Sequence, residues 1–300
     1  MQLSKEFKEA VLEALKADRA NYGGSDSAFA KNKWNINPAV WSQVKNGSST
    51  DGLIADNKLL EIGMVLNVTV NTRKWNVAET DVYRNLSDNL LFCKENSKSM
   101  VWVDDAEIGK TFCCRHILKG MTNSFYVDCS QSKTKQLFMR SVAKAVGVDN
   151  TGRYNDVKAK LKYYLKQLEK PLIVLDEAGD LDYPAFLEIK ELWNATEGVC
   201  GYYLIGADGL EEKMNRGIAW RKVGYREIFS RFNSQFVRVV PQVSDERIQF
   251  YRALITDVLN VNIKDRGLIP KIVKQCLGKD TSGQIGGLRR AQTLLMMMER

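Results

Sequence analysis

The sequence predicts an α/β protein whose parallel sheet is preceded by short helices and followed by a second helical segment. Five short apolar runs, rich in β-branched or aromatic residues, recur between residues 100 and 240 with helix-like sequence between them. Such strands indicate a parallel sheet covered on both faces. The flanking segments have helical patterns instead. We therefore expect a helical head (1–70), a linker (71–79), a core (80–240) and a C-terminal helical lid (241–300).

The composition narrows the classes of function. A formal charge of +8 and a pI near 9.0 favour a polyanionic partner. The chain has no run of eighteen apolar residues, so we expect no membrane partner and a cytoplasmic location. Six cysteines without a CxxC pair and a single histidine argue against a zinc site or a Cys-His catalytic pair. The cysteines are expected to be buried thiols.

The head is expected to contain four short helices. The first has apolar residues at helical spacing, namely Leu3, Phe7, Val11, Leu12 and Leu15. The others are expected over residues 25–33, 38–45 and 56–64. Ser25 or Asp26 and Asn37 are suitable N-caps, and Pro38 suits a first helical position. Asn46-Gly47 is a stop signal for the third helix.

Residues 25–47 fit a helix-turn-helix with its turn at residues 34–37. Ala30 is small enough to let the helices cross, and Val40 and Val44 are expected to face inward. The second helix would then present four side chains to a DNA groove or backbone: Trp41, Ser42, Gln43 and Lys45. Small helical modules that bind protein have similar patterns, so DNA and protein both remain possible partners of the head.

The strands of the core are expected at residues 100–103, 124–127, 172–175, 201–205 and 236–240. Lys133 and Lys135 follow the second strand, in a loop beside small polar residues. Loops at this edge of a sheet are accessible, and lysine is a common ligand of nucleic-acid phosphates. We therefore include both lysines among the candidate DNA contacts.

A phosphate-binding loop is predicted directly after the first strand. Gly109-Lys110-Thr111 follows that strand and opens a helix, which is the context that a P-loop requires. Backbone N–H groups and the helix N-terminus would receive the phosphates. Lys110 would reach the β and γ phosphates and Thr111 would bind Mg²⁺. ATP is thus expected at Asp105, Ala106, Glu107, Ile108, Gly109, Lys110, Thr111 and Phe112.

This loop departs from the GxxxxGK[ST] pattern at two positions. Asp104 stands where the pattern has its first glycine, and Glu107 adds a carboxylate that could repel phosphate. By itself the segment is also compatible with an ordinary βα turn that has a surface lysine. The nucleotide interpretation therefore needs a second motif.

The second motif is the apolar strand at residues 172–175, which ends in Asp176 and Glu177. Ligands of α/β proteins bind at the carboxyl edge of the sheet, so two acids there are well placed. Asp176 would hold Mg²⁺ through water, and Glu177 would polarise the attacking water. An Asp-Glu strand end after a Gly-Lys-Thr turn is much less common by chance than either motif alone.

Three further segments follow in the order typical of AAA+ ATPases. Asp208 comes after the fourth strand, where a polar side chain orients the hydrolytic water; most families have Asn, Thr or Ser there, and this chain has Ala207. Arg231 precedes the last strand, where an arginine finger is expected. Arg289 opens the last helix and could touch the γ-phosphate. Both arginines are also compatible with ordinary basic helix ends.

With these motifs in this order, the chain resembles the phage Mu B-like transposition proteins and related transposon-encoded AAA+ target selectors. The resemblance spans nearly the whole length. It implies binding of ATP and Mg²⁺, assembly on double-stranded DNA as a helical filament or ring, capture of target DNA and stimulation of a transposase. It also implies slow, DNA-stimulated ATP hydrolysis. Lys110, Thr111, Asp176, Glu177 and Arg231 would have the roles given above.

Two other classes of function remain open from the sequence. One is a helicase-loader-type ATPase, which has a similar core but usually lacks such a head. The other is a DNA-binding regulator that uses nucleotide as an ordering ligand without hydrolysing it. An ATPase assay with and without duplex DNA separates this regulator from the two ATPases.

Overall fold

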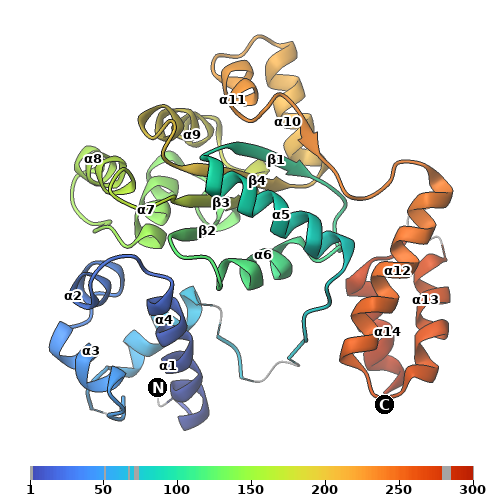
Figure 1. Cartoon of the computed structure of the whole chain (residues 1–300), viewed down its shortest axis with the longest axis horizontal. Coiled ribbons are helices and arrows are strands. Elements are labelled where there is room, and N and C mark those ends of the chain that lie inside the picture. The colour runs from blue at the N-terminus through green and yellow to red at the C-terminus, as the bar shows by residue number, and fades with distance from the viewer. Residues whose placement is uncertain (1–2, 51, 67, 71–73, 279–284, 300) are drawn as a thin grey trace.

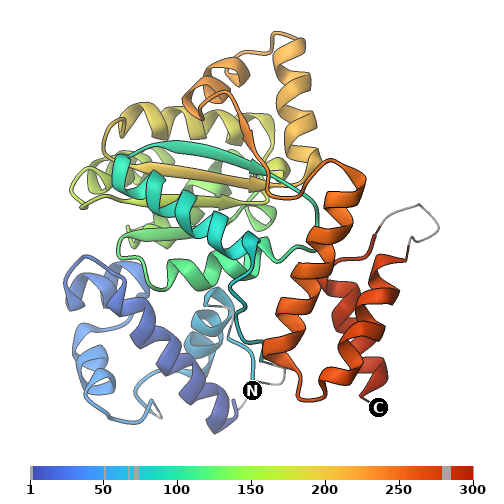
Figure 2. The same cartoon turned by 45° about the vertical axis from the view of Figure 1, so that its right-hand side comes forward.

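The computed structural model describes residues 3–50, 52–66, 68–70, 74–278 and 285–299, and the statements below concern these residues. They form three groups of elements, each with its own buried apolar cluster. The head and the C-terminal helices lie on the same side of the sheet-containing core, at opposite ends of it (Figure 1). Figure 2, which is turned about the vertical axis, shows the same arrangement.

The core contains one parallel sheet in the order β2-β3-β4-β1-β5. Its strands are β1 (Ser99–Val103), β2 (Ser124–Asp128), β3 (Leu172–Asp176), β4 (Gly201–Gly206) and β5 (Phe236–Val237). The predicted parallel sheet is confirmed. The fifth strand is shorter than the predicted 236–240, because the N–H groups of Val239 and Val240 donate to the Asp104 carboxylate.

Helices cover both faces of this sheet. One face is covered by α5 (Asp81–Asn96), α6 (Lys110–Leu118) and part of α12 (Ser244–Asn262). The other is covered by α7 (Lys135–Val146), α8 (Tyr154–Leu165), α9 (Tyr183–Ala195), α10 (Asp208–Ala219) and α11 (Tyr225–Arg231). Every residue of β3 and β4 is buried, which is why these strands are apolar without alternation.

The head consists of α1 (Lys5–Ala20), α2 (Asp26–Ala28), the π-helical turn η1 (Phe29–Lys33), α3 (Pro38–Lys45) and α4 (Asp56–Val65). Ser25 and Asn37 are N-caps, as predicted: their side-chain oxygens accept from the N–H groups of Ala28 and Ala39. The segment 25–33 is not one regular α-helix. It widens into η1, where Ile36 N donates to the Ala30 carbonyl over 2.8 Å.

The predicted exposure of Trp41 is wrong. Its side chain is 1% exposed, and its ring lies 5.2 Å from that of Phe29 in the centre of the head. In a helix of eight residues, the pairs 40/44 and 41/44 both fit helical spacing, and the larger indole buries more apolar surface. Trp41 therefore stabilises the head and cannot reach a DNA groove. Ser42, Gln43 and Lys45 are exposed.

The C-terminal helices are α12, η4 (Arg266–Leu268), α13 (Ile269–Leu277) and α14 (Leu288–Met298). The linker is tied to them: Asn76 N donates to Asn262 Oδ1 over 2.6 Å. Residues 71–73 of the predicted linker lie outside the described residues. All six cysteines are buried free thiols, as expected. In the described part of the chain, every helix is too short or too polar to cross a bilayer.

Candidate nucleotide-binding site

The loop between β1 and α6 forms the floor of a cavity. Gly109, the residue before α6, has a φ of 92°, a conformation that glycine adopts without a steric penalty. Lys110 folds back over the loop, and its Nζ donates to the carbonyl oxygens of Asp104 and Asp105, both over 2.6 Å. Burial lowers the pKa of Lys110, and the nearby carboxylates of Asp104 and Glu177 oppose that shift.

The cavity has a volume of about 310 Å³ and three walls. The loop and the start of α6 form the first, with Ala106, Glu107, Ile108, Gly109, Lys110, Thr111 and Phe112. The linker and the N-cap of α5 form the second, with Trp75, Asn76 and Ala78 from the linker and Thr80 from the N-cap. The C-terminal helices form the third, with Leu254, Val258, Leu288, Arg289 and Gln292. Asp105, which was expected at the nucleotide, is not among the lining residues.

The Gly-Lys-Thr loop and the Asp-Glu strand end meet at Asp176. Thr111 Oγ1 donates to Asp176 Oδ2 over 2.7 Å, and Tyr126 OH donates to the same oxygen over 2.7 Å. Tyr126 comes from β2 and was not predicted as a site residue. Burial raises its pKa, and the Asp176 charge adds to that shift, so the phenol stays a donor. The Asp176 carboxylate is thus held in one orientation beside the Thr111 hydroxyl, a pair of oxygens suited to Mg²⁺.

Glu177 lies at the edge of this pair and lines the cavity. Its backbone φ is 51°, in the left-handed region, so the chain turns sharply at the strand end. Burial raises the pKa of Glu177, and the neighbouring Asp176 charge raises it further, while Lys110 opposes both. A carboxylate with a raised pKa at the wall of a cavity is suited to accept a proton.

Asp104 is fully buried and explains the first departure from the glycine pattern. Its Oδ2 accepts from Val239 N over 2.6 Å, from Val240 N over 3.1 Å and from the Trp102 indole over 3.1 Å. The carboxylate therefore fixes the chain that leaves β5 to the start of the loop. The Asp104 side chain therefore has a structural role, which the sequence pattern alone does not show.

Restoring the pattern by Asp104→Gly should destabilise the protein. Three N–H donors would lose their acceptor, two of them on the buried residues Trp102 and Val240, and each loss of a buried partner costs about 1–3 kcal/mol. We expect the free energy of unfolding in urea to fall on the order of 3 kcal/mol. Asp104→Asn retains an acceptor oxygen and should lose less. If Asp104→Gly is as stable as the parent, the carboxylate does not hold the segment after β5.

The other two loop acids also contact the C-terminal segment. Asp105 Oδ2 accepts from Tyr251 OH over 2.6 Å and pairs with Arg247, both on α12. The Glu107 carbonyl accepts from Leu288 N over 2.8 Å, and its carboxylate accepts from Gly287 N over 3.3 Å. A Cβ on Gly287 would lie 2.6 Å from that of Glu107, so only glycine permits this approach. Glu107 is thus bonded to the start of α14.

The structure brings some of the other predicted residues to the cavity and leaves others outside it. Arg289 and Ala207 line it. Asp208, the first residue of α10, is exposed and does not line it. Arg231 lies outside the cavity as well: its Nε donates to Asn194 Oδ1 over 2.8 Å, and its guanidinium lies 5.1 Å from the Trp193 ring.

The predicted DNA-binding lysines are each paired with an acid of this chain. Lys45 Nζ lies 2.7 Å from Asp26, Lys133 Nζ lies 2.9 Å from Asp180, and Lys135 Nζ lies 3.2 Å from Glu188. Glu188 is almost completely buried, so its charge needs such partners. These lysines are therefore less available to phosphates than their sequence suggests.

Residues 95–214 match the family model described as "AAA domain". The match covers β1 to α10, with Lys110, Thr111, Asp176 and Glu177 inside it and Arg231 and Arg289 beyond it. A search of curated proteins gives no match. Together with the five-stranded parallel sheet, the family match supports an AAA+ ATPase family, whose members are nucleotide-dependent and generally bind ATP with Mg²⁺.

Proposed function

We propose that this chain is a DNA-stimulated AAA+ ATPase that assembles on duplex DNA and delivers that DNA to a transposase or activates the transposase. One observation carries the ATPase part: Lys110, Thr111 and Glu177 line one cavity, and the Thr111 hydroxyl is bonded to Asp176. This arrangement provides a cation for phosphates, two oxygens for Mg²⁺ and a base beside them. The family match gives independent support.

Four residues of the site then have roles toward ATP and Mg²⁺. Lys110 would exchange the two loop carbonyls for the β and γ phosphates, and the N–H groups at the start of α6 would bind phosphate oxygens. Thr111 and Asp176 would hold Mg²⁺, directly or through water. Glu177 would accept the proton of the attacking water. Bound Mg²⁺ would neutralise the charge that develops on the phosphates.

The apolar walls of the cavity are suited to the nucleotide base. Trp75 of the linker and Leu254 and Val258 of α12 line the cavity and give a surface on which a flat ring can pack. Arg289 at the start of α14 would approach the γ-phosphate. Because the linker, α12 and α14 share this cavity, ATP would hold the core and the C-terminal lid together.

The DNA and transposase parts of the proposal rest on other observations. The net charge of +8 favours a polyanionic partner. The head has exposed polar residues on α3, Ser42 and Gln43, that could contact DNA. The order of motifs resembles that of transposition ATPases. Sequence-independent binding through phosphates should weaken steeply with salt, because each contact releases counterions.

Arg231 is proposed to act on the ATP of a neighbouring subunit. It does not line the cavity of its own chain, and it rests on Trp193 and Asn194 at the surface of α9. An arginine that lies outside the cavity of its own chain can complete a nucleotide site only in another copy of the chain. ATP would then lie between subunits and promote assembly on DNA.

Mixing two inactive variants tests this proposal. Arg231→Ala should bind ATP like the parent but lose assembly on DNA and DNA-stimulated turnover, and Lys110→Ala should lose ATP binding. A mixture contains interfaces that combine an intact Lys110 with an intact Arg231, so part of the turnover should return. The readouts are phosphate release with and without duplex DNA, and electron microscopy of the assemblies.

Two results of this experiment count against parts of the proposal. A parent that binds ATP without any turnover would favour the non-hydrolysing regulator. An Arg231→Ala protein that still assembles with ATP on DNA, in a mixture that stays inactive, would remove the finger assignment. Arg266→Ala, at an exposed arginine of η4, is the control and should assemble normally.

A further inference from the structure

The hairpin of α10 and α11 projects from the core on the side away from the head and the C-terminal helices (Figure 1). Its connection is the segment 220–224. Packing holds this hairpin in place: a Cβ on Gly217 would lie 2.4 Å from the Tyr225 ring, and that ring stacks on Tyr183 and on Phe186 of α9. Tyr183 OH also donates to the Val223 carbonyl over 2.9 Å. The projection is therefore a fixed surface.

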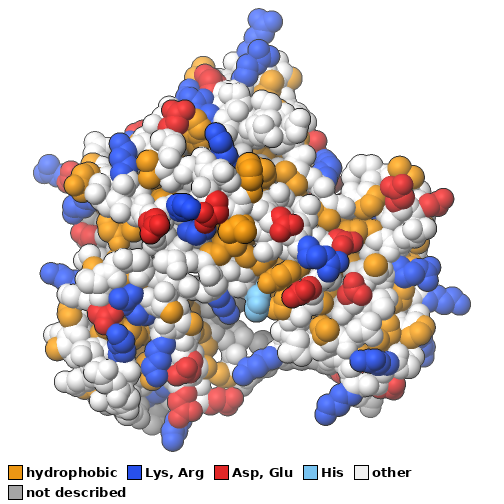
Figure 3. Space-filling model, viewed as in Figure 1, with side chains coloured by type: hydrophobic (Ala, Val, Ile, Leu, Met, Phe, Trp, Pro, Cys, Tyr) orange, Lys and Arg blue, Asp and Glu red, His pale blue; other side chains and the backbone are white. Residues whose placement is uncertain are grey.

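The end of this hairpin is basic. We use the name basic tip for Arg216, Trp220, Arg221, Lys222, Val223 and Arg226. Between Lys213 and Arg226 the sequence has five cations and no Asp or Glu. Basic side chains project over α10 and α11 at the top of the space-filling view (Figure 3). Such a concentration of one sign attracts polyanions.

The charges of the basic tip are largely unpaired. Within the described residues, Arg221, Lys222 and Arg226 form no ion pair, and only Arg216 is bonded to an acid, Glu212. Lys222 lies 4.0 Å from the centre of the Tyr183 ring, which leaves its ammonium group exposed to solvent on the other side. In contrast, Lys45, Lys133 and Lys135 each have a carboxylate partner.

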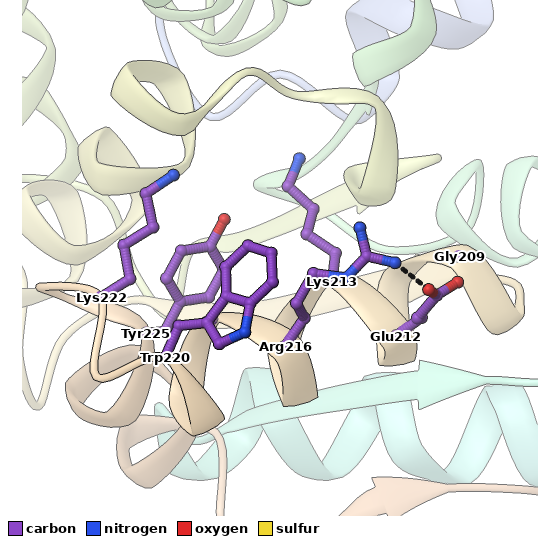
Figure 4. A pocket seen from close by; sticks show the side chains of 8 residues that line it. Gly209, Glu212, Lys213, Arg216, Trp220, Lys222 and Tyr225 are labelled. Carbon is purple, nitrogen blue, oxygen red and sulfur yellow. Dashed lines mark hydrogen bonds and ion pairs between the residues drawn. The ribbon is translucent and has the colours of Figure 1, made fainter.

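Exposed apolar groups accompany these charges. Trp220 is 72% exposed and Val223 is 69% exposed. A shallow cavity of about 260 Å³ lies beside them, lined by Gly209, Glu212, Lys213, Arg216, Gly217, Trp220, Lys222 and Tyr225. Figure 4 shows the Trp220 indole between Arg216 and Tyr225, with Lys222 beyond Tyr225. A large exposed aromatic side chain next to the cations of the basic tip indicates a binding surface rather than a packing site.

We propose that the basic tip is a contact surface for the backbone of duplex DNA. This inference rests on the proposed DNA-binding function and assigns it to α10 and α11, in addition to the head. The cations would bind phosphates, and Trp220 and Val223 would pack on the sugar edges of a groove. Single strands usually bind in concave basic grooves with several aromatic rings, whereas this surface projects and has one exposed ring.

A second copy of this chain is a less suitable partner for the basic tip. Each copy has a net charge of +8, so the tip and a neighbouring chain repel each other at long range. Duplex DNA has the opposite sign along its whole length. Charge complementarity thus favours DNA, and contact between subunits is an outcome that the test can identify.

The tip is also connected to the nucleotide site through α10. Lys213 Nζ donates to the carbonyl oxygens of Gly179, over 2.9 Å, and of Leu181. Gly179 and Leu181 lie in the turn that follows Asp176 and Glu177. A Cβ on Gly179 would meet Leu210 N at 3.2 Å, so α10 packs closely on this turn. DNA on the tip therefore contacts a helix that supports the strand end with the proposed base, and turnover is a useful second readout.

The test compares two charge-reversed variants of the full chain. The tip variant is Arg221→Glu with Lys222→Glu. The control is Lys271→Glu with Lys274→Glu, two exposed lysines of α13. Both variants lower the net charge by the same amount, so an effect of net charge alone would be equal in the two. Affinity for a fluorescent duplex of random sequence is measured with ATP over a series of salt concentrations. Thermal melting checks the fold, and Arg221→Gln with Lys222→Gln is a milder replacement.

We expect the tip variant to bind duplex DNA at least tenfold more weakly than the parent, with the salt slope smaller by about 2, and the control to remain close to the parent. Trp220→Ala should also weaken binding without changing the slope. The tip variant should retain its DNA-independent turnover and lose DNA stimulation. Equal weakening by tip and control would overturn the inference.

Other results separate this inference from the proposed function. If the parent binds duplex DNA and the tip variant binds equally well, the inference is wrong and the proposed function is unaffected. If the parent does not bind duplex DNA at low salt, the DNA-binding function and the inference both fail. Loss of ATP-dependent assembly without DNA, with unchanged DNA affinity, would identify the tip as a contact between subunits and overturn the inference.

Discussion

Lys110→Ala should abolish ATP binding at micromolar concentrations while leaving the fold intact. The ammonium group lies over the loop that lines the cavity, where it donates to two loop carbonyls. Charge-assisted hydrogen bonds contribute about 1.5–3 kcal/mol each, so losing two of them corresponds to about a hundredfold or more in affinity. Titration of ATP followed by calorimetry measures this change.

Lys119→Ala is the control for that experiment. Lys119 is an exposed lysine directly after α6, so the change removes the same charge outside the cavity. Its ATP affinity should equal that of the parent, and both variants should melt near the parent temperature. If Lys110→Ala binds ATP as well as Lys119→Ala does, the assignment of the loop to phosphates is wrong.

Glu177→Gln should reduce ATP turnover by a factor of about 10²–10⁴ and leave ATP affinity nearly unchanged. The amide has the shape of the carboxylate but cannot accept the proton of the attacking water. ATP should then stay bound, and complexes with DNA should last longer. Single-turnover hydrolysis and ATP titration distinguish the chemical step from binding. Glu197→Gln, at an exposed acid, is the control and should have parent turnover.

The same assignment gives a pH dependence. Burial and the Asp176 charge raise the pKa of Glu177, so its carboxylate takes up a proton at a higher pH than an ordinary glutamate does. Turnover of the parent should therefore decline as the pH falls, beginning above the ordinary glutamate range, and recover as the pH rises through the raised pKa. The residual turnover of Glu177→Gln should not show this decline at low pH. If turnover declines over the same pH range in both proteins, the group that titrates is not Glu177.

Much of the fold could be predicted because its signals are local. The five strands are short apolar runs bounded by polar residues, so their positions could be predicted, whereas their order in the sheet, β2-β3-β4-β1-β5, comes from the tertiary structure. The bounds of α3 agree with its predicted ones because Asn37, Pro38 and Asn46 act within one turn of the helix ends. Lys110, Thr111, Asp176 and Glu177 could be located together because carboxyl ends of parallel strands share one edge.

The prediction failed where two faces of a short helix were nearly equivalent. The sequence of α3 allows either Val40 or Trp41 to face the core, and propensity does not distinguish them. The position of Phe29 does: its ring lies against Trp41 and buries it. The linker residues of the cavity were missed for a related reason, since the segment 74–79 has no period and its contacts with α12 connect distant parts of the chain.

The sequence by itself determined the parallel α/β core and the four residues that bring a lysine, a hydroxyl and two carboxylates to one sheet edge. Only the tertiary structure decided what the acids of the loop do. Asp104, Asp105 and Glu107 bind partners that are 135, 146 and 180 residues away in sequence. No local pattern encodes such separations. The hydrogen bonds of Asp104 form once the chain after β5 packs against the loop, and those of Asp105 and Glu107 form once α12 and the start of α14 do. Their energy depends on that burial, which is why the two departures from the phosphate-loop pattern, Asp104 and Glu107, are contacts with distant segments of the chain.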